Sequence, residues 1–469
     1  MLFRRLHHDR LAQYGYLIAC QATKEAIVVD PLRDPAPYLD VARKEGVRIT
    51  LVTETHVHAD FVSGAAALAQ AAGAELLLSG EGAGPAAYDK GSFPRARWLR
   101  DGDRITLGRV RLDVWHVPGH TPEHVAFVVT DTAVSDAPMG LLSGDFLFVG
   151  DVGRPDLLER AAGLRGTMET SARQLLASLQ RLASLPDHLQ IWPGHGAGSA
   201  CGKSLGAVPQ STLGYERLTN WALQPDAARD FVSHVLEGQP DPPPYFARMK
   251  RLNARGAPPL PPLPPVTDGA LREQGASGAL VVDLRPAKEF AAGHLTGAIN
   301  LPYGSSFLAW SGSVIPPDRD VVLSAPMAMR AAAEAAAREL ALIGIDRVRV
   351  VHLMAQGSYG EAGWSETLSS IPAAALATPT SGVTVVDVRN RNEWDEGHIP
   401  GARLIPLPEL VARIDELRDA GPIAVHCQGG SRSAVAVSVL SAAGVRDVSN
   451  VEGGFSAWMR AGNTPVSGQ

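Results

Sequence analysis

The feature that most constrains this chain is an internal repeat with a constant offset of 104 residues. Eight residues of the first copy recur unchanged in the second, and a ninth, Phe290, recurs as Trp394; the eight are Asp283, Arg285, Glu289, Gly293, His294, Gly297, Ala298 and Pro302, which return as Asp387, Arg389, Glu393, Gly397, His398, Gly401, Ala402 and Pro406. Each copy holds two short apolar runs and then a helical stretch. Because β-branched runs that alternate with helices are typical of parallel βαβ units, each copy is predicted to be a doubly wound α/β domain.

Proline-rich segments predict where the domains begin and end. The segment APPLPPLPP at 257–265 favours an extended polyproline spacer. A weaker break, IPAAALATPTSG, covers residues 371–382 and precedes a new apolar run. We therefore predict a first domain at 1–257, a linker at 258–265, and repeat domains at 266–372 and 373–469.

Composition and charge narrow the class of protein. The chain is 45% hydrophobic and 20% charged, as expected for a soluble globular protein. Its 43 basic and 49 acidic residues give no electrostatic reason to expect a nucleic-acid partner. Three widely spaced cysteines, no apolar leader after the first arginines, and no apolar run of membrane-spanning length together predict a cytoplasmic protein without membrane contact.

Histidines and aspartates follow several apolar runs of the first domain. The string TETHVHADFVSG at 53–64 concentrates imidazoles and a carboxylate in a small volume, which is unfavourable unless a cation binds there. Three further residues follow in the strings PGHT, SGDF and PGHG. A single histidine in such a loop is usually a hydrogen-bonding turn residue, but this combination predicts a metal site made from His56, His58, Asp60, His120, Asp145 and His195.

This pattern resembles the metallo-β-lactamase superfamily across the whole first domain. The resemblance implies an αββα sandwich, followed here by the two α/β repeat domains. Binuclear members such as glyoxalase II use the string H-x-H-x-D-H for two metals, whereas Phe61 occupies its last position in this chain. An aromatic ring cannot act as a metal ligand, so we expect a mononuclear centre.

Two further strings, GRPD at 153–156 and PYFARMKRLNARG at 244–256, are similar to the persulfide dioxygenase branch of that superfamily. The similarity implies one Fe(II) per chain, held by His56, His120 and Asp145, and oxidation of a low-molecular-weight thiol persulfide by O₂ to sulfite. Two histidines and one carboxylate also form the facial triad that suits O₂ chemistry at non-haem iron. The alternative is zinc on His56, His58 and His120, activating water in a glyoxalase II-like thioester hydrolase.

Other residues near this centre receive less direct roles. We expect His58, Asp60 and His195 to hydrogen-bond the ligands, or to act as alternative ligands. By the resemblance, Arg154 supports the site or binds substrate, with a structural salt bridge as the alternative. Cys201 is expected to meet a persulfide near the metal, or else to be a buried apolar residue like Cys20.

The second repeat carries its own reactive group. Cys427 opens the string CQGGSRS, between an apolar run and a helical stretch. Backbone N–H groups, a helix N-terminus and Arg432 there stabilise a thiolate or an anion attached to it. We therefore predict a catalytic thiol and an anion-binding loop whose other members are Gln428, Gly429, Gly430 and Ser431.

This repeat resembles a rhodanese domain over its full length, through the strings DVR, EW, GHIPGA and VEGGFSAW. The resemblance implies sulfur transfer through a Cys427 persulfide, with sulfite as an acceptor and thiosulfate as the product. Four residues separate Cys427 from Arg432, whereas the related phosphatase loops have five. The first repeat has Ala325 opposite the thiol and PMAM in place of QGGS, which predicts an inactive domain serving as a spacer, dimer surface or docking platform. We expect a homo-oligomer.

Overall fold

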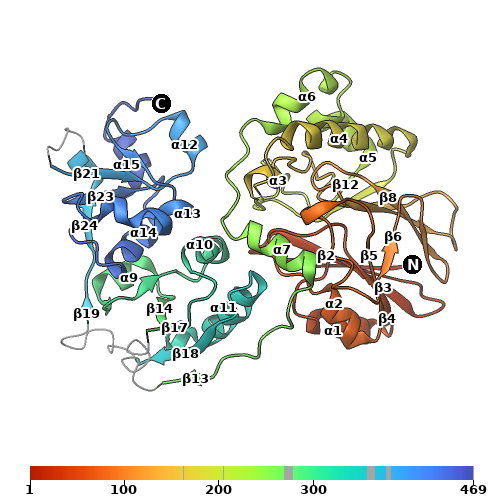
Figure 1. The fold of residues 1–469 in the computed structure, drawn as a ribbon, viewed down its shortest axis with the longest axis horizontal. Helices are drawn as coiled ribbons and strands as arrows, with labels where there is room; N and C mark the ends of the chain where they lie inside the picture. The colour runs from red at the N-terminus through yellow and green to blue at the C-terminus, as the bar shows by residue number, and fades with distance from the viewer. Residues whose placement is uncertain (162, 204, 269–277, 356–364, 377–381, 468–469) are drawn as a thin grey trace. The chain divides into compact units, whose positions relative to one another are not determined.

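A computed structural model describes the chain apart from residues 162, 204, 269–277, 356–364, 377–381 and 468–469 (Figure 1). The chain divides into two compact units, Met1–Leu260 and Pro261–Gln469. The division falls within the proline-rich segment. The carbonyls of Pro258 and Pro259 accept hydrogen bonds from the buried guanidinium of Arg33, which fastens the end of the first unit to its own body.

Two six-stranded sheets form the centre of the first unit. One has the strand order β1-β2-β3-β4-β5-β6 and the other β12-β11-β10-β9-β8-β7. The strands of the first sheet are β1 (Leu2–His8), β2 (Gln13–Ala19), β3 (Glu25–Val29), β4 (Arg48–Thr53), β5 (Glu75–Ser79) and β6 (Arg97–Leu99). Those of the second are β7 (Arg104–Leu107), β8 (Val110–His116), β9 (Val125–Asp131), β10 (Gly140–Gly144), β11 (Gln190–Pro193) and β12 (Ser211–Thr212).

Helices cover the outer face of each sheet, as Figure 1 shows for α1 and α2 on one side and α4 and α6 on the other. The helices are α1 (Ala36–Glu45), α2 (Ala65–Ala72), η1 (Gly84–Ala86), α3 (Leu157–Arg160), α4 (Met168–Gln180), η2 (Arg181–Ser184), α5 (Leu213–Thr219), η3 (Trp221–Leu223), α6 (Ala227–Leu236) and α7 (Phe246–Arg255).

Strand β2 shows why the two sheets stack. Leu17 and Ala19 pack against α1 and α2, whereas Tyr16 and Ile18 lie in the core between the sheets. Successive side chains of a strand point to opposite faces, so a strand that is apolar at successive positions, as β2 is from Tyr16 to Ala19, is buried on both. The predicted αββα sandwich is confirmed.

The first repeat in the second unit is a parallel sheet of order β13-β18-β17-β14-β16, with a small antiparallel pair β15-β19 beside it. Its strands are β13 (Val266–Thr267), β14 (Leu280–Asp283), β15 (His294–Leu295), β16 (Ile299–Asn300), β17 (Val321–Pro326), β18 (Val348–Met354) and β19 (Ser365–Glu366). Its helices are α9 (Ala287–Ala292), α10 (Phe307–Val314), η4 (Met327–Met329) and α11 (Arg330–Leu342).

The second repeat builds another parallel sheet, of order β20-β24-β23-β21-β22. Its strands are β20 (Ser369–Pro372), β21 (Thr384–Asp387), β22 (Arg403–Leu404), β23 (Ile423–His426) and β24 (Val448–Glu452). Its helices are η6 (Ala373–Leu376), α12 (Arg391–Glu396), α13 (Leu407–Leu410), η7 (Val411–Leu417), α14 (Ser431–Ala442) and α15 (Gly454–Arg460). The α/β fold predicted for both repeats is confirmed. No described helix combines the length and apolar composition needed to cross a membrane.

Candidate metal centre and thiol loop

The predicted metal ligands lie where strands of the first unit end. His56 follows β4, while His120, Asp145 and His195 follow β8, β10 and β11. Strand β9 runs antiparallel to both β8 and β10, and β11 runs parallel to β10, so these three strands end at one edge of their sheet. Side chains far apart in the sequence thus reach one place because the topology brings the strand ends together.

Three side chains converge there. One donor atom from each of His56, His120 and Asp145 lies within 4.8 Å of the others. The Nε2 atoms of His56 and His120 are 3.9 and 3.7 Å from Oδ2 of Asp145. All three side chains are buried, and Asp145 Oδ2 has no hydrogen-bond partner among the described residues. A buried carboxylate oxygen without a partner is costly, so the cluster has the donor set and the unmet need that a cation would fill.

The opposite ring nitrogens of the two histidines are anchored. His120 Nδ1 donates to the Arg154 carbonyl at 3.0 Å. His56 Nδ1 donates to Thr55 Oγ1 at 3.0 Å, because that hydroxyl itself donates to Asp30. Burial lowers the pKa of His120 to about 4 and that of His56 well below its usual value. Both rings are therefore neutral, with an Nε2 lone pair available to a metal.

His58 and His195 are bonded to carboxylates instead, and Asp60 is one of the partners of His195. His58 Nε2 lies 3.1 Å from Asp30 Oδ1, and its ring packs on that of Phe61 at 4.3 Å. His195 bridges Asp145 at 2.7 Å and Asp60 at 2.8 Å. Burial lowers the pKa of His195, but these two carboxylates raise it well above its usual value. His195 thus hydrogen-bonds the ligand Asp145, and His58 shares Asp30 with Thr55, the partner of His56; their predicted role as alternative ligands stays a prediction.

Cys201 and Arg154 lie beside this network. Donor atoms of Asp60, His195 and Cys201 form a second group within 4.8 Å, and Cys201 is buried. Burial, followed by the Asp60 charge, raises the pKa of its thiol well above the usual value. The guanidinium of Arg154 is buried in a two-handed pair with Asp156, while its carbonyl accepts from His120. The salt-bridge alternative is therefore present, and the predicted substrate roles of Arg154 and Cys201 stay predictions.

Several residues of the site escaped the sequence reasoning. His124 Nε2 accepts a hydrogen bond from the Asp145 backbone N–H at 3.0 Å. Glu54 and Glu123 are buried behind the ligand loop, where Tyr88 donates to Glu54 at 3.0 Å and Lys250 lies 4.0 Å from Glu123. The string PEHV, with a histidine directly before a strand, was the available signal for His124. No local sequence pattern indicates the contacts of Glu54 and Glu123.

Helix α7 holds the ligand loop through Asn253. Its side-chain nitrogen donates to the carbonyls of His58 at 2.8 Å and Phe61 at 2.7 Å, and its oxygen accepts from the Ser63 N–H at 2.9 Å. Asn253 is buried, so water does not replace these bonds. The segment 244–256, singled out by its sequence, therefore braces the loop that carries His56.

Cys427 lies in a tight loop between β23 and α14. Its Sγ accepts from the Gly430 N–H at 3.1 Å and from the Ser433 hydroxyl at 3.5 Å. Gly430 has a φ of 100°, a backbone conformation that favours glycine, and this turn directs its N–H at the sulfur. The loop thus presents hydrogen-bond donors to the thiol, as an anion-binding loop does.

Side chains around this loop are held by ion pairs. Arg432 makes a two-handed pair with Glu393 at 2.6 and 2.7 Å. Burial raises the pKa of Glu393 and lowers that of Arg432, but the pair outweighs burial, so the pKa of Glu393 is below its usual value and that of Arg432 above it. Arg389 donates to Gln428 Oε1 at 3.2 Å. Glu393 and Arg389 were seen in the repeat but given no role at the thiol. The predicted anion contacts of Arg432, Gln428 and the loop amides stay predictions.

The corresponding segment of the first repeat has no such loop. Strand β17 continues through Pro326, and Met327–Met329 forms a 3₁₀ turn. Ala325 is fully buried within the strand, and Arg330 pairs with Glu334 of its own helix at 3.0 Å. A reactive thiol and a glycine turn are both missing from this segment.

Comparisons with known proteins agree with this architecture. Residues 8–195 match the metallo-beta-lactamase superfamily, and residues 267–357 and 373–461 each match the rhodanese-like domain. The crystal structure of a metallo-beta-lactamase from Staphylococcus aureus subsp. aureus COL is 41% identical, with a TM-score of 0.68, over 75% of this chain and 99% of that one.

Several curated relatives match part of the chain. A hydroxyacylglutathione hydrolase from Polaromonas sp. (strain JS666 / ATCC BAA-500) is 35% identical over 39% of this chain and 61% of its own length. A hydroxyacylglutathione hydrolase from Acaryochloris marina (strain MBIC 11017) is 32% identical over 36% and 59%. The persulfide dioxygenase ETHE1, mitochondrial, from Bos taurus is 28% identical over 42% and 68%. The chain thus spans about 60% of the two hydrolases. It belongs to the metallo-β-lactamase superfamily and carries two rhodanese-like domains behind that domain.

Proposed function

We propose that this protein is a persulfide dioxygenase joined to a sulfurtransferase. Its first unit would oxidise a low-molecular-weight thiol persulfide with O₂ to sulfite, using one Fe(II) per chain. Its last domain would transfer sulfane sulfur from Cys427 to sulfite, giving thiosulfate. Such a chain removes reduced sulfur, so sulfide detoxification is the process it fits.

One observation carries the dioxygenase assignment. Two neutral imidazole nitrogens and one carboxylate oxygen converge, while Phe61 occupies the position of a further donor and His58 is bonded to Asp30. Two histidines and a carboxylate suit iron that must leave positions open for other ligands. His56, His120 and Asp145 would hold the ion, which when bound supplies the site for O₂ and persulfide activation.

The surrounding residues keep this donor set in place. Thr55 and the Arg154 carbonyl fix the two imidazole tautomers. His195 hydrogen-bonds the carboxylate of Asp145, and the ring of His124 accepts from the Asp145 backbone N–H. These groups are buried and exclude bulk water. Burial by itself would raise the pKa of Asp145, but the charge and hydrogen bond of His195 lower it below its usual value, so Asp145 stays ionised. The overall conversion is RSSH + O₂ + H₂O to RSH, SO₃²⁻ and two protons.

Sulfur transfer at Cys427 requires no oxidant, because the sulfur that moves is already at the sulfane level in the donor persulfide. The Cys427 thiolate attacks the outer sulfur of a thiol persulfide, the S–S bond breaks, and the electron pair leaves with the thiol. Sulfite then attacks the outer sulfur now on Cys427, releasing thiosulfate and the thiolate. The Gly430 N–H and the Ser433 hydroxyl, which bond Sγ, stabilise the thiolate as the leaving group.

A zinc-dependent thioester hydrolase is the second candidate for the first unit. The two relatives named as hydroxyacylglutathione hydrolases, from Polaromonas and Acaryochloris, favour it. On this hypothesis His58 would join His56 and His120 around zinc, and a bound water would attack a thioester. His58 has a ring nitrogen without a partner, Nδ1, for such a role, but His58 is not in the group whose donor atoms lie within 4.8 Å of one another, whereas the iron hypothesis uses only the three side chains of that group.

Metal analysis and oxygen uptake separate the two. Protein purified without added metal should contain about one iron per chain, a stoichiometry that suits a mononuclear triad, and should consume O₂ with glutathione persulfide. His120→Ala and Asp145→Ala should lose metal and oxygen uptake, whereas His188→Ala, an exposed histidine of the same domain, should keep both. Zinc as the bound metal, with thioester hydrolysis and no oxygen uptake, would overturn the proposal.

Product analysis tests the coupling. Cys427→Ser should leave oxygen uptake nearly intact while the product changes from thiosulfate to sulfite, and Cys20→Ser should not change the product. Equal thiosulfate from wild type and Cys427→Ser would contradict the coupling. The cytoplasmic location, the homo-oligomer and the identity of the persulfide stay predictions.

A further inference from the structure

Helix α7 carries a buried cation, Lys250, that makes no hydrogen bond to a described residue. Lys250 is 5% exposed. Its ion pair is with Glu123, whose Oε1 lies 4.0 Å from Nζ, which is longer than a hydrogen bond. An ammonium group offers three donors and no acceptor, so leaving it unbonded inside a protein is costly. Lys250 therefore needs an acceptor that the described residues do not supply.

The ammonium lies beside the loop of metal ligands. Lys250 and Asn253 are three residues apart on α7, so they share a face of the helix. Asn253 holds the ligand loop by bonding two of its carbonyls. The Glu123 oxygen that lies 4.0 Å from Lys250 also accepts from the Val57 N–H at 2.9 Å. Val57 directly follows His56, so the cation is next to the backbone that positions this ligand.

The charge of Lys250 acts on the ligands themselves. Burial is the main cause of the low pKa of His56 and of His120, and the positive charge of Lys250 contributes to lowering both. Burial also lowers the pKa of Lys250, whereas Glu123 and then Cys201 raise it. Charges shift a pKa mainly at short range. Because His56 and His120 follow strands of different sheets, a cation that acts on both lies where the loops of the two sheets meet.

Tyr245, directly before α7, supplies a second donor. It is 8% exposed, and its hydroxyl makes no hydrogen bond to a described residue. Burial, followed by the charges of Asp60 and Cys201, raises the pKa of this hydroxyl well above its usual value, so it stays protonated. Neither the Tyr245 oxygen nor Lys250 Nζ belongs to the polar atoms that are fully enclosed without a partner. Both atoms thus keep some accessible surface, which a small ligand can reach.

From these placements we infer that Lys250 and Tyr245 form an anion-binding subsite beside the metal ligands, which takes the outer sulfur of the persulfide anion and the sulfite formed from it. The ammonium and the hydroxyl would donate hydrogen bonds to the ligand, without any covalent bond. Asp60, Glu123 and Asp145 are buried acids of the same site, so an anionic substrate requires a cation there. This inference rests on the proposed dioxygenase, whose substrate and product are sulfur anions.

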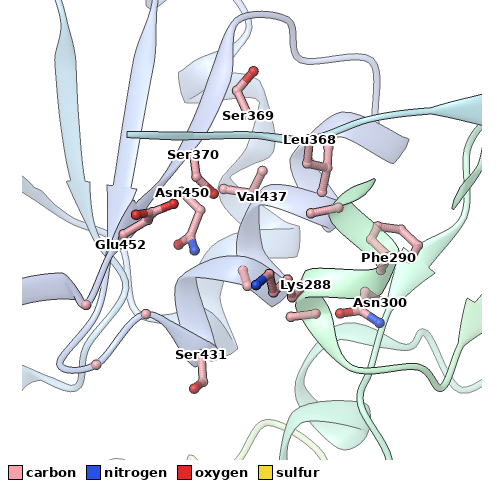
Figure 2. Close-up of a pocket in the computed structure, with 16 residues that line it drawn as sticks. Lys288, Phe290, Asn300, Leu368, Ser369, Ser370, Ser431, Val437, Asn450 and Glu452 are labelled. Carbon is pink, nitrogen blue, oxygen red and sulfur yellow. The ribbon is translucent and has the colours of Figure 1, made fainter. Parts of the chain in front are cut away.

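A pocket in the second unit supplies a matched control (Figure 2). It has a volume of about 460 Å³ and lies between α9 of the first repeat and β20 and α14 of the second. Its cation is Lys288, which is exposed. Cys427 is not among the described residues that line it, and the side-chain oxygens of Asn300 and Asn450 are enclosed. Lys288→Met thus removes the same charge as Lys250→Met, but from the other unit.

Binding of sulfite tests the inference without turnover. Calorimetry is done on the full chain with the metal with which it is purified, without O₂, in a Cys427→Ser background so that no persulfide there consumes the sulfite. Lys250→Met should weaken sulfite binding about tenfold or more, and Tyr245→Phe about threefold, because each loses a hydrogen bond to an anion. Lys250→Arg should keep most of the affinity, and Lys288→Met all of it. Metal content should stay at the background value in each variant, and circular dichroism checks folding.

The outcomes are distinct. Equal sulfite affinity with and without Lys250→Met, as binding at the thiol loop alone would give, would overturn the inference. Equally tight binding of acetate, or loss of the metal from Lys250→Met, would also overturn it. In oxygen uptake, Lys250→Met should raise KM for glutathione persulfide about tenfold, and sulfite should inhibit the variant less than the wild type.

Failure of this inference differs from failure of the proposed function. If the wild type takes up no O₂ but its sulfite binding depends on Lys250, the dioxygenase proposal fails and the subsite stands. If oxygen uptake has the same KM and kcat in wild type and Lys250→Met, the subsite fails and the dioxygenase stands.

Discussion

Asn253→Ala should detach helix α7 from the metal-ligand loop. The substitution removes three hydrogen bonds and leaves the His58 and Phe61 carbonyls and the Ser63 N–H buried without partners. An unsatisfied buried group costs about 1–3 kcal/mol, so the loss should be about 4 kcal/mol in total. That is a large fraction of the roughly 5–15 kcal/mol that stabilises a domain, and it corresponds to a fall in Tm of about 10 °C for a unit of this size.

Calorimetry of the full chain measures the transition of the first unit, and hydrogen exchange of a peptide covering residues 54–64 measures the loop directly. We expect faster exchange of the Ser63 amide and iron binding weakened by about tenfold, because the loop positions His56. Arg251→Ala, at an exposed position of the same helix, is the matched control and should change neither. A loss below about 1 kcal/mol with unchanged exchange would show that the brace contributes nothing.

Two further predictions concern the repeats. Ala325→Cys, made in a Cys427→Ser background, should not restore sulfur transfer from thiosulfate to cyanide, because residue 325 is buried in a strand and Met327–Met329 forms no glycine turn; robust transfer would contradict this. Glu393→Gln should destabilise the second unit by about 1 kcal/mol at pH 7. Since Arg432 holds the pKa of Glu393 below its usual 4.5 despite burial, the difference between wild type and variant in urea unfolding should be constant above that pH and disappear as pH falls through the lowered value; a difference that persists under strongly acidic conditions would refute it.

The sequence was most informative where the pattern of apolar residues, or the constant offset between the repeats, determines which layer of the fold a segment occupies. Strand β2 is buried at every position because helices cover one face and a second sheet the other. The constant offset between the repeats predicted two similar α/β domains, since residues such as Asp283 and Asp387 end equivalent strands. Loops with no regular pattern gave only approximate domain limits.

The candidate site was predictable only as far as its strand ends. The pattern of polar residues after apolar runs singled out six residues, and the resemblance to the persulfide dioxygenases implied His56, His120 and Asp145 among them; the structure does bring these three together. Which donors remain available depends on partners far away in the chain. Asp30 is bonded to Nε2 of His58, and Asn253, about two hundred residues downstream, hydrogen-bonds the loop that carries His58. Pairwise distances of this kind leave no local pattern in a sequence.

The two repeats have the same fold, but only the second carries a reactive thiol. Arg285 pairs with Asp283 at 2.7 Å, and Arg389 pairs with Asp387 at the same distance. Identical residues thus form the same ion pair at the end of the equivalent strand in each repeat. The repeats differ where chemistry is involved. The glycine loop of Cys427 has no counterpart in the first repeat. An exact duplicate would carry two thiols; here only the second copy has the thiol and its loop, and the first keeps the same fold without them.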